Sequence, residues 1–260
     1  MTNINQYGWK ALIGSAVGYA MDGFDLLILG FMLSAISADL NLTPAQSGSL
    51  VTWTLVGAVV GGIVFGALSD RYGRVRVLTW TIVLFAVFTG LCAIAQGYWD
   101  LLIYRTIAGI GLGGEFGIGM ALAIEAWPAK HRAKAASYVA LGWQVGVLAA
   151  ALLTPVLLPH IGWRGMFVVG IFPAFVAWYL RTRLHEPEIF SRKQTALSTQ
   201  KTSKLESFKL LIKDKATTKV SLGVVVLTSV QNFGYYGIMI WMPNFLSKQL
   251  GFSLTKSGLW

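Results

Sequence analysis

The chain has 260 residues, of which 55% are hydrophobic and 12% are charged, and its mean hydropathy is +0.62. A soluble domain carries about 25% charged residues, so this composition excludes a globule covered by solvated side chains. The net charge of +10 comes from short basic clusters between apolar stretches, which does not favour nucleic acid as a partner.

Seven apolar stretches are long enough to cross a bilayer, which takes about 20 residues. They predict membrane-spanning helices at 11–38, 47–69, 76–96, 101–126, 134–158, 164–184 and 219–246. An eighth apolar stretch begins at Leu254 and is cut off at Trp260. The sequence therefore predicts an all-α, polytopic membrane protein.

The basic residues predict an orientation, because Lys and Arg are retained on the cytoplasmic side of a membrane. Of the 21 Lys and Arg residues, Arg164, Lys248 and Lys256 lie in loops on one side, and Arg105 lies within a span. All the others share the opposite side with the N-terminus. We therefore expect a cytoplasmic N-terminus and an integral plasma-membrane location, as in a bacterial inner membrane.

A long polar segment divides the chain into three parts. Residues 1–184 are predicted to form a six-helix N-terminal transmembrane bundle, and 185–218 a basic cytoplasmic linker. Residues 219–260 begin a second bundle, with helix seven and the truncated start of helix eight. The basic linker is expected to lie beside anionic lipid headgroups, so the lipid bilayer is a predicted partner.

Three acidic residues lie within the predicted spans, namely Asp22 and Asp25 in the first and Glu115 in the fourth. A charge at bilayer depth costs a few kcal/mol on insertion scales, and such residues usually mark a path for ions or substrates. Asp22 and Asp25 are three positions apart on adjoining parts of one helix face, so both should not ionise easily. We expect the three acids to be proton-coupling sites; the alternative is that they are hydrogen-bonded structural acids.

The loop after the second span reads GALSDRYGRVRVL. Gly66 is expected to let two helices approach closely, and Gly73 to permit a tight turn. Asp70 can accept from the N–H groups of a helix N-terminus or pair with arginine, and Arg71 and Arg74 offer fork-shaped donors. These five residues resemble the G-x-x-x-D-R-x-G-R signature of major facilitator transporters. The resemblance implies a cytoplasmic latch that opens and closes during transport; the alternative is plain anchoring by positive charge.

The fourth span resembles a second signature of that superfamily, in which an arginine precedes spaced glycines. Gly109, Gly113 and Gly117 recur every four residues, so a neighbouring helix can pack tightly against this face. Arg105 precedes Glu115 by about 15 Å along a straight helix, which is too far for direct pairing. We expect Arg105 to contact a substrate anion or to relay a proton; the alternative is an interfacial anchor that snorkels outward.

Further segments resemble proton symporters of this superfamily that carry aromatic acids or sialic acid. One is the DGFD sequence of the first span, and another is EAWP, whose Glu125, followed by Arg132, extends the predicted latch. The seventh span is aromatic, and one of Tyr235 and Tyr236 is expected to line a substrate cavity. Gln144 in the fifth span is expected either to face that cavity or to bond to a helix.

The resemblance implies the major facilitator fold and proton-coupled uptake of a small organic acid anion, such as an aromatic acid or sialic acid, by alternating access. The proton is the coupling ion, with no other cofactor and no metal, and the complete protein is expected to act as a monomer. The sequence has no phosphate-binding loop, nucleophile elbow or metal-ligand spacing, so we do not expect an enzyme. The alternatives are a uniporter or antiporter for another metabolite and a truncated, non-transporting fragment.

Overall fold

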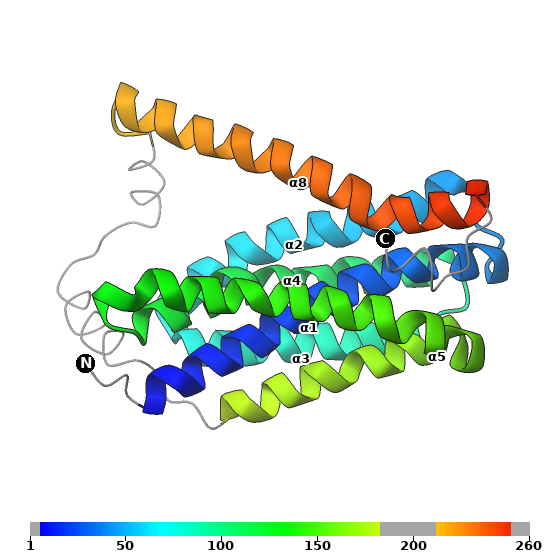
Figure 1. Cartoon of the computed structure of the whole chain (residues 1–260), viewed down its shortest axis with the longest axis horizontal. Helices are drawn as coiled ribbons and strands as arrows, with labels where there is room; N and C mark the ends of the chain where they lie inside the picture. Colours follow the sequence, from blue (N-terminus) through cyan, green and yellow to red (C-terminus); the bar gives the residue numbers. More distant parts are fainter. Residues whose placement is uncertain (1–5, 183–211, 251–260) are drawn as a thin grey trace.

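The computed structural model describes residues 6–182 and 212–250, which form a bundle of long helices (Figure 1). Successive helices run in opposite directions through this bundle. The elements are α1 (Gln6–Asp39), α2 (Pro44–Tyr72), α3 (Arg74–Cys92), α4 (Tyr98–Glu125), the short 3₁₀ turn η1 (Ala129–His131), α5 (Arg132–Thr182) and α8 (Lys215–Leu250). Within the described ranges, six helices are long and apolar enough to cross a membrane.

Helix α5 is two helical arms joined at Gly162. The backbone there has φ 65° and ψ 177°, a conformation that glycine adopts without steric cost. Figure 1 shows the chain reversing at this point, so that the second arm runs back along the bundle. The two spans predicted at 134–158 and 164–184 therefore correspond to the two arms, although residues 183 and 184 lie outside the described part.

Helix α2 begins at a capping box and ends at a glycine. The amide of Gln46 donates to Oγ1 of Thr43 (3.2 Å), and the amide of Thr43 donates to Oε1 of Gln46 (2.9 Å), with Pro44 at the first helical position. These contacts satisfy amides that a helix start leaves without partners. At the other end Gly73 has φ 104°, as the predicted tight turn requires, and α3 follows at once.

Small residues allow close helix packing at the centre of the bundle. A Cβ atom at Gly113 would collide with the carbonyl oxygen of Ala58, so α4 lies directly on the backbone of α2. Gly146 is pressed in the same way against the carbonyl oxygen of Ala20, where the first arm of α5 crosses α1. The predicted tight packing of the α4 glycine face is thus confirmed at Gly113, whereas a Cβ at Gly117 would meet nothing within 4 Å among the described residues.

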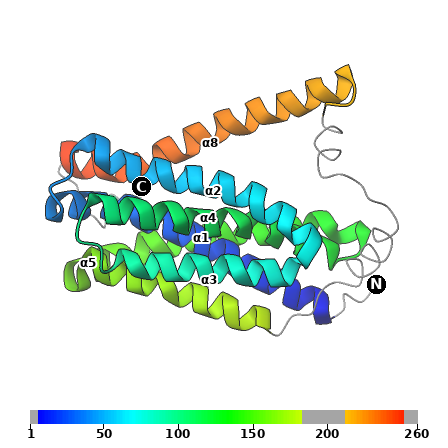
Figure 2. The same ribbon diagram turned by 180° about the vertical axis from the view of Figure 1, so that it is seen from behind.

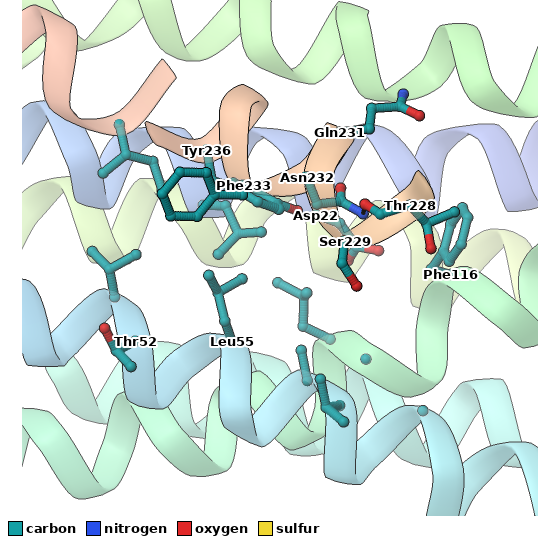
Figure 3. A pocket seen from close by; sticks show the side chains of 18 of the residues that line it. Asp22, Thr52, Leu55, Phe116, Thr228, Ser229, Gln231, Asn232, Phe233 and Tyr236 are labelled. Atoms are coloured by element: carbon teal, nitrogen blue, oxygen red, sulfur yellow. Dashed lines mark hydrogen bonds between the residues drawn. The ribbon is translucent and has the colours of Figure 1, made fainter. Parts of the chain in front are cut away.

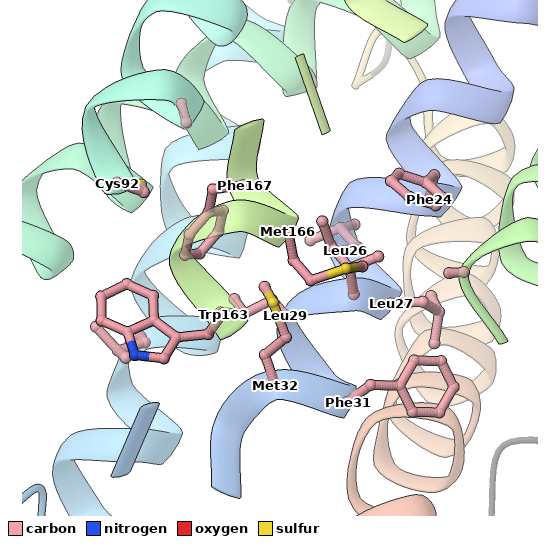
Figure 4. Close-up of a cluster of buried hydrophobic side chains, with 14 of the residues drawn as sticks. Phe24, Leu26, Leu27, Leu29, Phe31, Met32, Cys92, Trp163, Met166 and Phe167 are labelled. Atoms are coloured by element: carbon pink, nitrogen blue, oxygen red, sulfur yellow. The ribbon is translucent and has the colours of Figure 1, made fainter. Parts of the chain in front are cut away.

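The apolar core is centred on α1 and the second arm of α5, and it extends to residues of α2, α3 and α4 (Figure 4). Met32 of α1 and Phe167 of α5 are fully buried there, and Trp163 stacks edge-on against Phe167 with ring centroids 6.0 Å apart. Burying such side chains contributes about 1.5–3 kcal/mol each relative to water. Because α1 is buried along most of its length, it is the central helix on which the others pack.

Helix α8 stands at an angle to the other helices and packs against α1 (Figures 1 and 2). Asp214 caps its start by accepting from the amide of Thr217 at 2.9 Å, and this hydrogen bond holds the pKa of Asp214 below its usual value. The predicted seventh span, 219–246, lies within α8. The rest of the predicted linker before residue 212, and the eighth apolar stretch, lie outside the described residues.

Candidate functional site

A buried ion pair joins α1 to α4. Arg105 donates from Nη1 to Oδ1 of Asp25 (3.0 Å) and from Nη2 to Oδ2 (2.7 Å), and the two side chains are 0% and 1% exposed. The guanidinium also lies 5.7 Å from the ring centroid of Phe167. The alternative of an outward-snorkelling Arg105 is therefore wrong, because this side chain points into the core and is neutralised there.

The energetics of this pair follow from its burial. Two charges taken out of water are tolerated only when they are paired and hydrogen-bonded, and removing one partner typically costs about 3–5 kcal/mol. The arrangement of α1 against α4 therefore depends on both charges of this pair being present.

A cavity of about 1010 Å³ lies between α8 and the rest of the bundle. Its wall is formed by residues of α1, α2, α4, α5 and α8. Asp22 borders it from α1, and Figure 3 shows the polar ends of Ser229 and Asn232 projecting from α8 into it. Among the described residues that line the cavity, Asp22 is the only one with an ionisable acidic group of the Asp or Glu type. No Lys, Arg or His is among them. Asp22 and Asp25, three positions apart, thus face different surroundings.

Aromatic side chains gather beside Asp22. Tyr19 packs on Phe116 with ring centroids 4.7 Å apart and on Trp143 at 5.2 Å, and all three rings line the cavity. Of the two tyrosines predicted from the sequence, Tyr236 lines the cavity, as expected for one of them. Tyr235 instead accepts a hydrogen bond at 2.7 Å from the indole nitrogen of Trp143.

Trp143 was not identified from the sequence, although it lies next to the predicted candidate Gln144. Its position between Gly142 and Gly146 could have indicated its role, because these two glycines pack on α1 and Trp143 is therefore turned towards the same helix. Gln144 is exposed on the bundle surface and is not among the residues that line the cavity. Glu115 is 2% exposed within α4, and likewise is not one of the lining residues.

An ionic network connects three helix ends at the side predicted to be cytoplasmic. Arg74 donates from Nε and Nη2 to the carboxylate of Glu125 (3.1 and 3.0 Å), and from Nη1 to Oγ of Ser69 (3.1 Å). Its Nη2 also lies 3.2 Å from Asp70, whose side chain is 72% exposed. The predicted pairing of Asp70 with an arginine is confirmed, and the more enclosed contact of Arg74 is with Glu125.

The other predicted latch residues take different places. Arg71 lies over the ring of Tyr72, 5.3 Å from its centroid, and Arg132 donates from Nε to the carbonyl of Trp127 at 3.4 Å, just past the end of α4. The close helix approach expected at Gly66 is wrong for the described residues, because a Cβ atom there would meet nothing within 4 Å. At this end of α2 the contact with α4 is made by Phe65, whose side chain lies against Gly114, and not by Gly66.

Replacing Glu125 with Gln is expected to weaken this network without preventing membrane insertion. The change removes the charge that holds two guanidinium nitrogens, so we expect a loss of about 1 kcal/mol in stability and slower transport. Asp70→Asn, which removes an exposed partner, should lower the stability less. Thermal unfolding in detergent measures the stability of the two variants, and uptake by the complete protein measures their transport. Equal unfolding temperatures for wild type and both variants would mean that the network does not hold the helices together.

Six membrane-length helices, a buried charge pair and a large cavity between helices are typical of a multi-pass membrane protein of the transporter class. The model of the Major Facilitator Superfamily matches residues 15–260, and the chain belongs to this superfamily. Over 263 aligned residues it is 89% identical to a provisionally named metabolite transport protein of Haemophilus influenzae, covering 100% of this chain and 65% of that protein.

Two other relatives have more specific names. A cis,cis-muconate transport protein of Acinetobacter baylyi is 33% identical, with 96% of this chain and 61% of that protein covered. The sialic acid transporter NanX of Escherichia coli is 34% identical, with 69% of this chain and 44% of that protein covered. The chain thus spans less than two thirds of the length of these three relatives.

Solved structures show the same fold. A crystal structure of a D-xylose–proton symporter superposes with a TM-score of 0.75 at 23% sequence identity, covering 98% of this chain and 65% of that one. A bacterial homologue of the human lysosomal transporter Spinster, in an inward-facing conformation, gives a TM-score of 0.71 at 20% identity. The predicted all-α major facilitator fold is therefore confirmed for the N-terminal part that the chain covers.

Proposed function

We propose that the complete protein takes up a small organic acid anion together with a proton. The observation that carries this proposal is the buried pair of Asp25 and Arg105 between α1 and α4, one helical turn from an acid that borders the cavity. A carboxylate held by arginine in the core can accept a proton when the helices separate and release it when they close. The names of the muconate and sialic acid relatives support an organic acid as the substrate.

The residues have separate proposed roles in this cycle. Asp25 takes and releases the coupling proton, with Arg105 as its counter-ion, and Glu115 is a second proton site in α4. Asp22, Tyr235 and Tyr236 lie at or beside the cavity, where the substrate binds. The network of Asp70, Arg74 and Glu125 is the cytoplasmic latch. We also propose that the complete protein works as a monomer.

The decisive experiment places the complete protein in proteoliposomes and imposes a pH gradient, acidic outside. Benzoate and sialic acid serve as radiolabelled probes. We expect accumulation above the external concentration, and its collapse when a protonophore removes the gradient. Uptake that reaches equilibrium but never exceeds it, with or without a gradient, would instead identify a uniporter of the same fold. Absence of any carboxylate movement would contradict the proposal.

We also propose that the N-terminus is cytoplasmic, in a bacterial inner membrane. The support is the asymmetry of Lys and Arg between the two sides. Cysteines introduced at Gln96 and Lys130 lie at opposite ends of the bundle and are both exposed. An impermeant maleimide added to intact cells is expected to label Gln96→Cys and to leave Lys130→Cys unlabelled until the cells are lysed. The reverse pattern would invert the orientation.

A further inference from the structure

The cavity wall carries an acidic side chain, whereas a wall that binds a carboxylate needs cationic groups. Among the described residues the wall contains Asp22 and no cationic side chain. A substrate carboxylate placed beside Asp22 would meet a like charge in surroundings of low dielectric, where the repulsion is weakly screened. The part of the substrate that lies against α1, α4 and α5 must therefore be its uncharged end.

The same wall is built to hold a flat ring. Tyr19, Phe116, Trp143 and Tyr236 all line the cavity, and Tyr19 contacts both Phe116 and Trp143 through its ring. The hydrogen bond from Trp143 to Tyr235 fixes the indole between α5 and α8, so this surface is held in place before a ligand arrives. Aromatic rings stack favourably at centroid distances of about 4.5–7 Å, which suits a planar substrate ring.

Asp22 is placed at the edge of this aromatic surface. It lies one turn after Tyr19 on α1, so the two side chains occupy the same face of the helix. An ionised carboxylate has about four acceptor positions and no donor, so it can receive a ligand hydrogen bond in addition to contacts within the protein. The complementary ligand group is a donor, such as a ring hydroxyl or a protonated ring nitrogen.

We propose that Asp22 determines specificity by accepting a hydrogen bond from a donor on the substrate ring, with the substrate carboxylate directed away from α1. This inference rests on the proposed uptake of an organic acid. It assigns to Asp22 a contact with the substrate, whereas the coupling proton is carried by the pair of Asp25 and Arg105. The ligand class is a planar ring with a carboxylate at one end and a hydrogen-bond donor at the other.

The test compares two ligands that differ in the donor. 4-Hydroxybenzoate carries a ring hydroxyl opposite its carboxylate, and 4-methoxybenzoate has a similar shape but can only accept. Equilibrium binding to the complete protein is measured by tryptophan fluorescence and by displacement of labelled 4-hydroxybenzoate, and uptake is measured in parallel. We expect wild type to bind the hydroxyl compound about tenfold more tightly, as for a hydrogen bond to a charged acceptor.

The variants Asp22→Asn and Asp22→Glu separate this role from a structural one. Asp22→Asn removes the charge and should reduce the preference to about twofold or less, because a neutral acceptor makes a weaker bond. Asp22→Glu keeps the charged acceptor and should retain a preference of more than threefold. Binding of 4-methoxybenzoate by Asp22→Asn at close to wild-type affinity serves as the internal check that the cavity is intact.

Each outcome bears on one proposal. A wild-type protein that binds both ligands equally, or neither, overturns the assignment of Asp22. An unchanged preference in Asp22→Asn, or a loss of 4-methoxybenzoate binding in that variant, overturns it as well, since the acid would then be structural. Normal binding with the expected preference but without uptake leaves the assignment of Asp22 standing and contradicts the proposed transport instead.

Discussion

Asp25→Asn is expected to abolish proton-driven accumulation while exchange of labelled for unlabelled substrate at equal pH continues. The amide keeps the shape of the carboxylate but cannot bind and release a proton. It also leaves the buried guanidinium of Arg105 without its anion, which should lower the free energy of unfolding by about 3–5 kcal/mol. Gradient-driven uptake and counterflow in proteoliposomes measure the first effect, and thermal unfolding measures the second.

The double variant Asp25→Asn/Arg105→Gln is the matched control. Removing both charges avoids a single buried ion, so we expect part of the lost stability to return. Accumulation should stay absent, because the proton site is still missing. Glu115→Gln, which leaves the pair of Asp25 and Arg105 in place, is also expected to lose accumulation. If Asp25→Asn accumulates substrate like wild type, the pair is structural and coupling occurs elsewhere.

The second large effect is expected from Gly113→Ala. The added methyl group would collide with the backbone carbonyl of Ala58 on α2, and a backbone atom cannot move aside by changing rotamer. Separating α2 from α4 should cost about 1–3 kcal/mol or more, as overpacked cores do. Gly117→Ala lies one turn further along α4 and meets nothing within 4 Å among the described residues.

The comparison of these two alanine variants isolates the packing effect from helix propensity. Both replace a helical glycine, and alanine favours a helix by about 0.8–1.0 kcal/mol. We therefore expect Gly113→Ala to unfold at a lower temperature than wild type, and Gly117→Ala to unfold at the same temperature or a higher one. Equal shifts in the two variants would show that α2 and α4 are not held in direct backbone contact.

The helices and their packing faces could be predicted from the sequence because they depend on local patterns. Apolar length gave the spans, and the glycine spacing of α4 gave the face that packs on α2. The reversal near Gly162 could be placed because polar and basic residues interrupt an apolar run there. The predicted close approach at Gly66 was wrong. Gly66 and Gly113 are the same residue type, and only the three-dimensional arrangement decides which glycine another helix contacts.

The partner of a buried charge could not be read from the sequence. Distance along α4 correctly separated Arg105 from Glu115, but nothing local indicates that Arg105 reaches Asp25, because the two lie on different helices. Asp22 and Asp25 could likewise not be distinguished. Their spacing puts them on adjoining parts of α1, and only the placement of α4 and α8 turns one towards the core and the other towards the cavity.

The spacing of these two aspartates along α1 bears on how binding and protonation communicate. Three residues correspond to a rise of about 4.5 Å in a helix, so a ligand at Asp22 and a proton at Asp25 act on a single rigid turn. No long chain of intermediaries between the two events is required. Under the proposed coupling, whatever factor a bound proton adds to substrate affinity must equal the factor that bound substrate adds to proton affinity. Titration of either site with and without the other occupant should therefore return one shared interaction free energy.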